Sequence, residues 1–216
     1  MPLQNRVDPF GEIHAVAARG LFTGNRGVIH DPATKTLLKR RWTTKAWLIC
    51  ECDFRDRKRE VMGRNAPSGN AGWTELFFLD EVTALAAGHR PCFYCRRERA
   101  KEFSDCFAAG NALVRPKVTE IDAILHRERL ASGGTLKCLT SEEAAQLPDG
   151  AMVARDGAAY AIRNGRALRW SFEGYADAGP LEALASPCLL TPPATVAALR
   201  RGYKAVWAPG ADRPAG

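Results

Sequence analysis

Two cysteines separated by two residues form the part of the chain best suited to metal chemistry. They are Cys92 and Cys95 in "GHRPCFYCRRERAK", residues 88–101. A tight turn at this spacing lets two thiolates meet one Zn²⁺ ion at tetrahedral geometry. Two thiolates make only half of a site, so the remaining ligands must come from elsewhere in the chain. The spacing therefore predicts that Cys92 and Cys95 begin a zinc site.

A second cysteine pair lies upstream, in "ICEC". If residues 45–54 form a strand, Cys50 and Cys52 point to the same side and can converge on the same ion. The same alternation also permits a plain core face shared with Leu48 and Phe54. We expect a mixed outcome, in which Cys50 or Cys52 contributes a ligand and another group, such as His89, completes the shell.

The other three cysteines are isolated in apolar contexts, and we expect them to pack in the core: Cys106, Cys138 and Cys188. Seven irregularly spaced cysteines do not suit a secreted disulfide framework. The opening segment "MPLQNRVDPF" lacks the apolar region of a signal peptide, and no apolar run approaches the length of a membrane span. These features predict a cytoplasmic protein.

Basic residues occur in clusters, and the formal net charge is +7. Arg96, Arg97 and Lys101 follow the cysteine pair, where the first turns of a helix favour phosphate. Arg40 and Arg41 precede a tryptophan that could stack on a base. Each cluster taken alone is also typical of a solvated surface. Together they predict a nucleic-acid partner, either DNA or RNA.

A different class of function is suggested by Asp122 and His126. They are four residues apart, on one face of an expected helix, and could act with His30 and Asp31 as metal ligands or as a base. Such pairs also occur as surface partners. A metal-dependent hydrolase or nuclease is therefore one alternative, and a protein-interaction module with a structural zinc is another.

The elements expected to position these residues mix strands and short helices without a βαβ rhythm, which predicts an α+β fold with small mixed or antiparallel sheets around the zinc knuckle. The expected strands cover residues 45–54, 59–62, 74–79 and 135–140, and a hairpin turns at Asn164 and Gly165. The expected helices follow Asp80, Cys95, Thr119 and Thr191. We expect a zinc-binding region at 1–115 and a second α+β region at 116–216.

One segment carries a family resemblance. "ELFFLDEVTALAAGHRPCFYCRRE", residues 75–98, resembles the second half of the metal-binding domain of Ada-type DNA-alkylation repair proteins. That domain holds zinc with four cysteines on a small α+β unit, and one thiolate accepts a methyl group from a DNA phosphotriester. The resemblance implies that Cys92 and Cys95 are zinc ligands. The family's first pair is C-x3-C, whereas this chain has "CEC", so the resemblance assigns the methyl-accepting role to no residue.

The whole chain is also similar to a group of bacterial proteins that share the "RPC-x-x-C" core and a C-terminal "LTPP" helix. Taken together, the residues and the resemblance predict a zinc-binding, nucleic-acid-associated protein with a role in DNA repair or processing.

Overall fold

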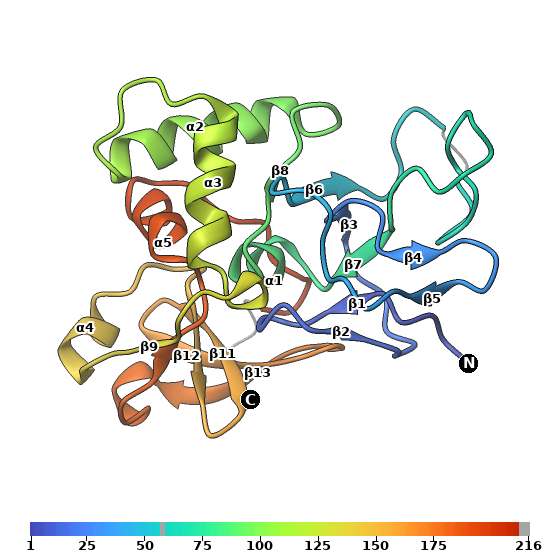
Figure 1. The fold of residues 1–216 in the computed structure, drawn as a ribbon. Helices are drawn as coiled ribbons and strands as arrows, with labels where there is room; N and C mark the ends of the chain where they lie inside the picture. The colour runs from blue at the N-terminus through green and yellow to red at the C-terminus, as the bar shows by residue number, and fades with distance from the viewer. Residues whose placement is uncertain (57–58, 212–216) are drawn as a thin grey trace.

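The N-terminal strands form a six-stranded mixed sheet in the computed structural model, which describes residues 1–56 and 59–211 (Figure 1). The strand order is β2-β1-β7-β3-β6-β8, with parallel pairing of β1 to β7 and of β6 to β8. The strands are β1 (Arg6–Val7), β2 (Ile13–His14), β3 (Phe22–Asn25), β6 (Leu48–Glu51), β7 (Leu76–Phe78) and β8 (Arg90–Pro91). A two-stranded ribbon, β4 (His30–Asp31) with β5 (Thr36–Leu37), lies beside this sheet.

The C-terminal strands form a second six-stranded sheet, antiparallel throughout, in the order β13-β12-β11-β10-β14-β9. The strands are β9 (Lys137–Cys138), β10 (Met152–Arg155), β11 (Ala158–Arg163), β12 (Arg166–Ser171), β13 (Gly174–Pro180) and β14 (Cys188–Leu189). The hairpin predicted at Asn164 and Gly165 is confirmed between β11 and β12. Both turn residues have positive φ, as this tight hairpin turn requires.

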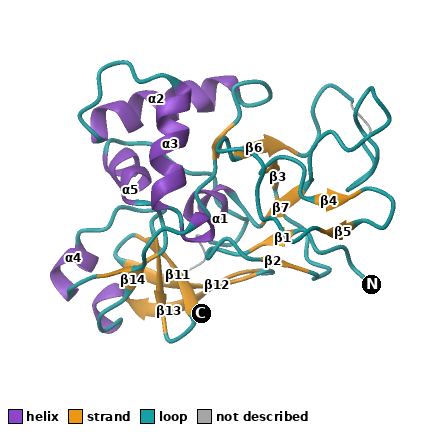
Figure 2. Cartoon of the chain, viewed as in Figure 1, coloured by secondary structure: helices purple, strands orange, loops and turns teal. Residues whose placement is uncertain are grey.

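The helices are short, and α2, α3 and α5 lie together beside the second sheet (Figures 1 and 2). The α-helices are α1 (Glu81–Ala86), α2 (Arg97–Gly110), α3 (Val118–Glu128), α4 (Ser141–Ala145) and α5 (Pro193–Arg200). Single 3-10 turns occur at η1 (Leu130–Ser132) and η2 (Leu181–Ala183). Two sheets with short helices confirm the predicted α+β fold.

Three local predictions were wrong. Residues 59–62 form turns and irregular chain rather than a returning strand. Helix α3 is capped at Lys117, and Thr119 lies inside its first turn. Helix α5 is capped at Pro192, because the Thr191 hydroxyl accepts a hydrogen bond from the Met152 amide instead.

Helix α1 joins the two halves of the molecule. Its cap Asp80, predicted from the sequence, accepts hydrogen bonds from the Thr83 amide (2.8 Å) and from the Tyr175 hydroxyl on β13 (2.9 Å). The next residue, Glu81, is fully buried and accepts from the Tyr203 hydroxyl at 2.6 Å. One hydrophobic cluster extends from Val7 to Tyr203. The expected division at residues 115 and 116 stays a prediction, and the core is continuous across it.

Candidate metal centre

Three cysteine thiols converge where β6 meets the segment that follows β8. The sulfur atoms of Cys50, Cys92 and Cys95 all lie within 4.8 Å of one another. Strand pairing sets this position, because β8 runs parallel to β6 and the Cys92 amide donates to the Ile49 carbonyl at 3.0 Å. Residues far apart in the sequence are thereby brought to one point.

The turn after β8 places the second and third sulfurs. The Arg96 amide donates to the Cys92 carbonyl at 2.9 Å, which closes a turn over residues 92–96 and begins α2. The Tyr94 amide donates to the Cys92 sulfur at 3.4 Å. An amide directed at a sulfur favours the thiolate, which is the form that binds metal.

The thiols interact strongly with one another. Hydrogen bonds from Cys50 and then Cys95 lower the pKa of Cys92 to about 2, whereas the pKa of Cys50 is raised by its hydrogen bonds to Cys92 and Cys95 and by burial. The Cys92 sulfur is therefore the thiolate of the three, and the thiols of Cys50 and Cys95 donate hydrogen bonds to it. A dication would take the place of those protons, since metal binding displaces protons from thiol ligands.

Two of the residues expected near the metal lie outside the cluster. Strand β6 ends at Glu51, so Cys52 has left the strand alternation; it is exposed, and its thiol donates to the Leu21 carbonyl at 3.5 Å. His89 is fully buried, and its Nε2 atom accepts from Arg26 at 3.3 Å. Of the residues expected to complete the shell, the structure therefore places Cys50 beside Cys92 and Cys95, and not Cys52 or His89.

The donor set suits a thiophilic metal ion. Among the described residues, no fourth histidine, cysteine or carboxylate joins the three thiols. Three protein ligands plus one exogenous ligand is the arrangement found at zinc sites that retain an open position, whereas structural sites use four protein ligands. Thiolates also bind copper(I) and iron–sulfur clusters, so the ligands alone do not identify the metal.

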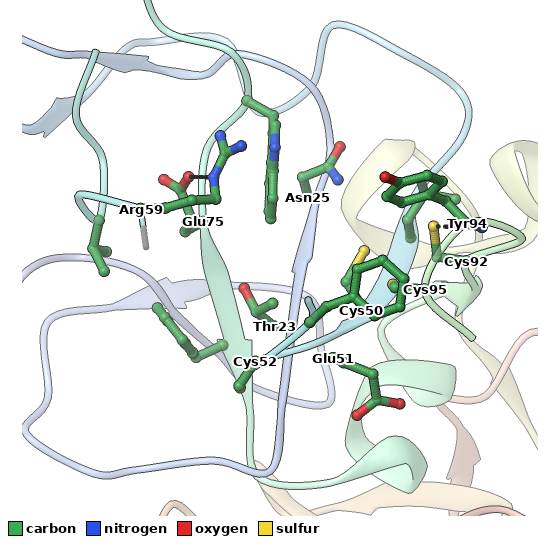
Figure 3. Close-up of a pocket in the computed structure, with 15 residues that line it drawn as sticks. Thr23, Asn25, Cys50, Glu51, Cys52, Arg59, Glu75, Cys92, Tyr94 and Cys95 are labelled. Carbon is green, nitrogen blue, oxygen red and sulfur yellow. Dashed lines mark hydrogen bonds and ion pairs between the residues drawn. The ribbon is translucent and has the colours of Figure 1, made fainter. Parts of the chain in front are cut away.

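A cavity of about 610 Å³ borders the cluster. It lies over the face of β3, β6 and β7 that carries Thr23, Asn25 and Phe77, and all three cluster cysteines line it. Figure 3 shows Cys50, Cys92 and Cys95 grouped at one end of the cavity and the Arg59–Glu75 ion pair at the other. A metal held by the thiols would therefore be accessible from a ligand-sized space.

The predicted phosphate-binding residues differ in their accessibility. Arg96 is only 5% exposed and forms ion pairs with Glu81 (2.7 Å) and Glu51 (2.9 Å), so it is a structural residue and not a surface contact. Arg97 is exposed, and Lys101 is exposed but paired with Glu98 at 3.0 Å. Arg96 is therefore not available for the phosphate contact predicted at the start of α2.

The loop between β5 and β6 keeps its predicted basic residues at the surface. Arg40 and Arg41 are both exposed there. The neighbouring Trp42 packs edge-on to the His126 ring at 5.6 Å and lies 6.3 Å from the Trp47 ring. This loop therefore exposes basic side chains and packs on aromatic rings.

The predicted catalytic residues have other partners. Both carboxylate oxygens of Asp122 accept from Arg90, at 2.7 and 2.9 Å, and Asp122 is buried. His126 contacts Arg129 at 2.8 Å, and His30 contacts the Thr74 hydroxyl at 2.7 Å. Within the described part of the chain, these groups form no metal-binding cluster with Asp31. The convergence that a hydrolase site would require is not present.

Sequence reasoning missed a disulfide between Cys138 and Cys188, which were expected to pack separately in the core. The two residues are direct partners in the antiparallel pairing of β9 with β14. Cys106 is half-buried against the core, as expected. The cavity residues Arg59, Trp73 and Glu75 were also missed, because no local motif marks them.

No family model matches the chain, and no curated protein or solved structure matches it either. The resemblance to the Ada-type domain accordingly rests on residues 75–98 alone. None of the described helices combines the length and the apolar character needed to cross a membrane.

Proposed function

We propose that this chain is a zinc-binding protein that associates with nucleic acid. The observation that carries the proposal is the convergence of three thiols beside a cavity, on a molecule that also exposes a basic, aromatic loop. A role in DNA repair or processing is the process that the short resemblance to Ada-type proteins suggests.

Zinc is the metal that best suits the centre. It accepts thiolate ligands at tetrahedral geometry and needs no redox partner. Cys50, Cys92 and Cys95 would hold it, and the Tyr94 amide would stabilise the charge on the Cys92 sulfur. When bound, the ion would supply a Lewis acid at the edge of the cavity.

The surface proposed for nucleic acid is the loop at residues 39–45. Beneath it, the guanidinium groups of Arg26 and Arg129 lie 4.0 and 3.6 Å from the Trp47 ring. Both arginines are buried, and neither has a carboxylate within ion-pair distance among the described residues. Burial lowers the pKa of each to about 9, so both stay charged at pH 7. Since no carboxylate pairs directly with either arginine, their charges add to the field of Arg40 and Arg41.

Binding to short single-stranded and duplex DNA and RNA, measured against salt concentration, tests the association. Replacing both Arg40 and Arg41 by alanine should weaken binding to different sequences equally and flatten the salt slope by about 2, because each lost phosphate contact contributes about 0.9. A variant with Arg169→Ala and Arg200→Ala loses the same charge from exposed positions on β12 and α5. Equal effects of the two variants, or no binding by the wild type at low salt, would refute the proposed surface.

The alternative of a hydrolase built on Asp122 and His126 has no support in the geometry, since the Arg90 and Arg129 side chains engage them. The alternative of a purely structural zinc fits less well, because such sites are closed by four protein ligands.

A further inference from the structure

We propose that the cavity beside the cysteines binds one planar nitrogen heterocycle of nucleobase size, and that a ring nitrogen of this ligand completes the coordination of the metal. This inference rests on the proposed metal centre and identifies the class of ligand that the centre takes.

The size of the cavity requires a ligand larger than water. Its volume of about 610 Å³ lies within the range of pockets that hold small organic molecules, about 300–1,000 Å³. A single water occupies about 30 Å³ in the liquid. The space next to the thiols therefore accommodates a one- or two-ring compound.

The walls of the cavity favour a flat aromatic ligand. They include four aromatic side chains: Phe54, Trp73, Phe77 and Tyr94. Tyr94 belongs to the cysteine turn, is 55% exposed, and packs edge-on to Phe54 with ring centres 5.3 Å apart. Aromatic side chains in a cavity wall are suited to packing against a planar ligand, here alongside Arg55, whose guanidinium lies 5.1 Å from the Phe54 ring and 5.6 Å from the Tyr94 ring.

The charge of the centre favours a neutral donor. Three thiolates and one Zn²⁺ ion sum to one negative charge, and a carboxylate, phosphate or further thiolate would add to it. Both carboxylates in the cavity wall are already paired, Glu51 with Arg96 at 2.9 Å and Glu75 with Arg59 at 3.0 Å. A neutral ring nitrogen is an ordinary zinc ligand and adds no charge.

Polar groups in the wall can hold the edge of such a ring. The Nη2 atom of Arg59 is buried and has no hydrogen-bond partner within the part of the chain that the structure describes. Its guanidinium lies 4.5 Å from the Trp73 ring, at the end of the cavity opposite the cysteines (Figure 3). Asn25 also lines the cavity, and its Oδ1 atom accepts a hydrogen bond from the Gly27 amide at 3.2 Å. A heterocycle with an acceptor remote from its metal-binding nitrogen matches this arrangement.

The test uses protein loaded with Co²⁺, whose visible spectrum reports its ligands. Benzimidazole and indene are the matched probes, because they share one bicyclic shape and only benzimidazole carries nitrogen. We expect benzimidazole and adenine to change the cobalt d–d bands with saturation, and indene to leave them unchanged. Identical spectra with and without saturating benzimidazole and adenine would overturn the proposal.

Variants at Tyr94 test the stacking wall. Tyr94→Ala should weaken benzimidazole binding about tenfold, the effect of losing one stacking ring, while Tyr94→Phe keeps the ring and should bind as the wild type does. Equal affinity in all three proteins would contradict the assigned wall. Both variants keep the cysteines, so their thiolate-to-cobalt absorption serves as the folding control.

The source of the ring is resolved by a second comparison. A free base or nucleoside should bind alone if the ligand is a small molecule. If the ligand is a base within a strand, an oligonucleotide should change the cobalt spectrum, and the same oligonucleotide with all bases removed should not. Failure to take up cobalt would overturn both this inference and the metal centre, whereas cobalt uptake with no spectral response to any nitrogen ring would overturn this inference alone.

Discussion

The Cys50 sulfur on β6 lies within 4.8 Å of the sulfur of Cys92, the residue directly after the neighbouring strand β8. The parallel pairing of these two strands produces this proximity, and the Cys92 amide bonded to Ile49 fixes its register. The cysteine cluster is therefore part of the sheet edge. A substitution of Cys50 or Cys92 should therefore alter the stability of the first sheet.

Cys50 and Cys52 form a natural matched pair for testing the ligand set. Cys50→Ser should weaken metal binding by at least about 100-fold, because losing even an outer-shell partner typically costs about 10–100-fold. Cys52→Ser should leave metal affinity unchanged, since Cys52 faces the Leu21 carbonyl. Competition with a chromophoric chelator measures both. Similar losses in the two variants would mean that Cys52 is a ligand after all.

Arg96 should contribute to stability and not to nucleic-acid binding. Its removal leaves Glu81 fully buried with one fewer cation, and breaking a buried pair in this way costs about 3–5 kcal/mol. Arg97→Ala, at the exposed neighbouring position, should change stability by less than about 0.5 kcal/mol. Urea unfolding monitored by circular dichroism provides the comparison. An unchanged midpoint for Arg96→Ala would contradict the assigned role.

Asp80 should make stability depend on pH. Burial raises its pKa above the ordinary 3.8, so the folded state binds the proton more tightly than the unfolded chain does. Its contribution is thus fully present below pH 3.8 and is lost as the pH rises through the folded pKa.

The difference in unfolding free energy between the wild type and Asp80→Asn isolates this effect, because the asparagine does not titrate. We expect the wild type to lose stability relative to Asp80→Asn as the pH rises from 3.8 through the folded pKa of Asp80. Asp80→Ala should cost about 2–4 kcal/mol at low pH, since the cap and the partners Tyr175 and Ala208 are lost, and less as the pH rises. A pH-independent difference for the asparagine variant would show that Asp80 titrates normally.

The Cys138–Cys188 disulfide should stabilise the second sheet without affecting the metal. It joins residues separated by 50 positions, a loop for which chain entropy predicts about 4 kcal/mol. The double change to alanine should lower the free energy of unfolding by up to that amount and leave metal content unaltered. Loss of metal in this variant would indicate that the two cysteine groups are coupled.

The features that sequence reasoning recovered are mostly local ones. The spacing of Cys92 and Cys95, the cap at Asp80 and the turn at Asn164 each depend on a few adjacent residues. The distinction between Cys50 and Cys52 depends on where β6 ends. The chain turns just afterwards, through positive φ at Arg55 and Asp56, whereas the sequence pattern predicts a strand that continues to Phe54.

The features that it missed depend on long-range pairing. Arg96 is buried because Glu81 on α1 and Glu51 on β6 meet it there. The disulfide requires the register of β9 against β14. The same residue types on an exposed helix or in separate loops would have fitted the sequence equally well, so only the tertiary structure could decide.

The central claim is that Cys50, Cys92 and Cys95 hold one zinc ion. Elemental analysis of the purified wild-type protein, alongside Cys92→Ser, tests it most directly. The account predicts one zinc per chain in the wild type, and loss of that zinc together with a lower melting temperature in the variant. Wild-type protein that contains no thiolate-bound metal, takes up none when zinc is supplied, and melts at the same temperature as Cys92→Ser would contradict it.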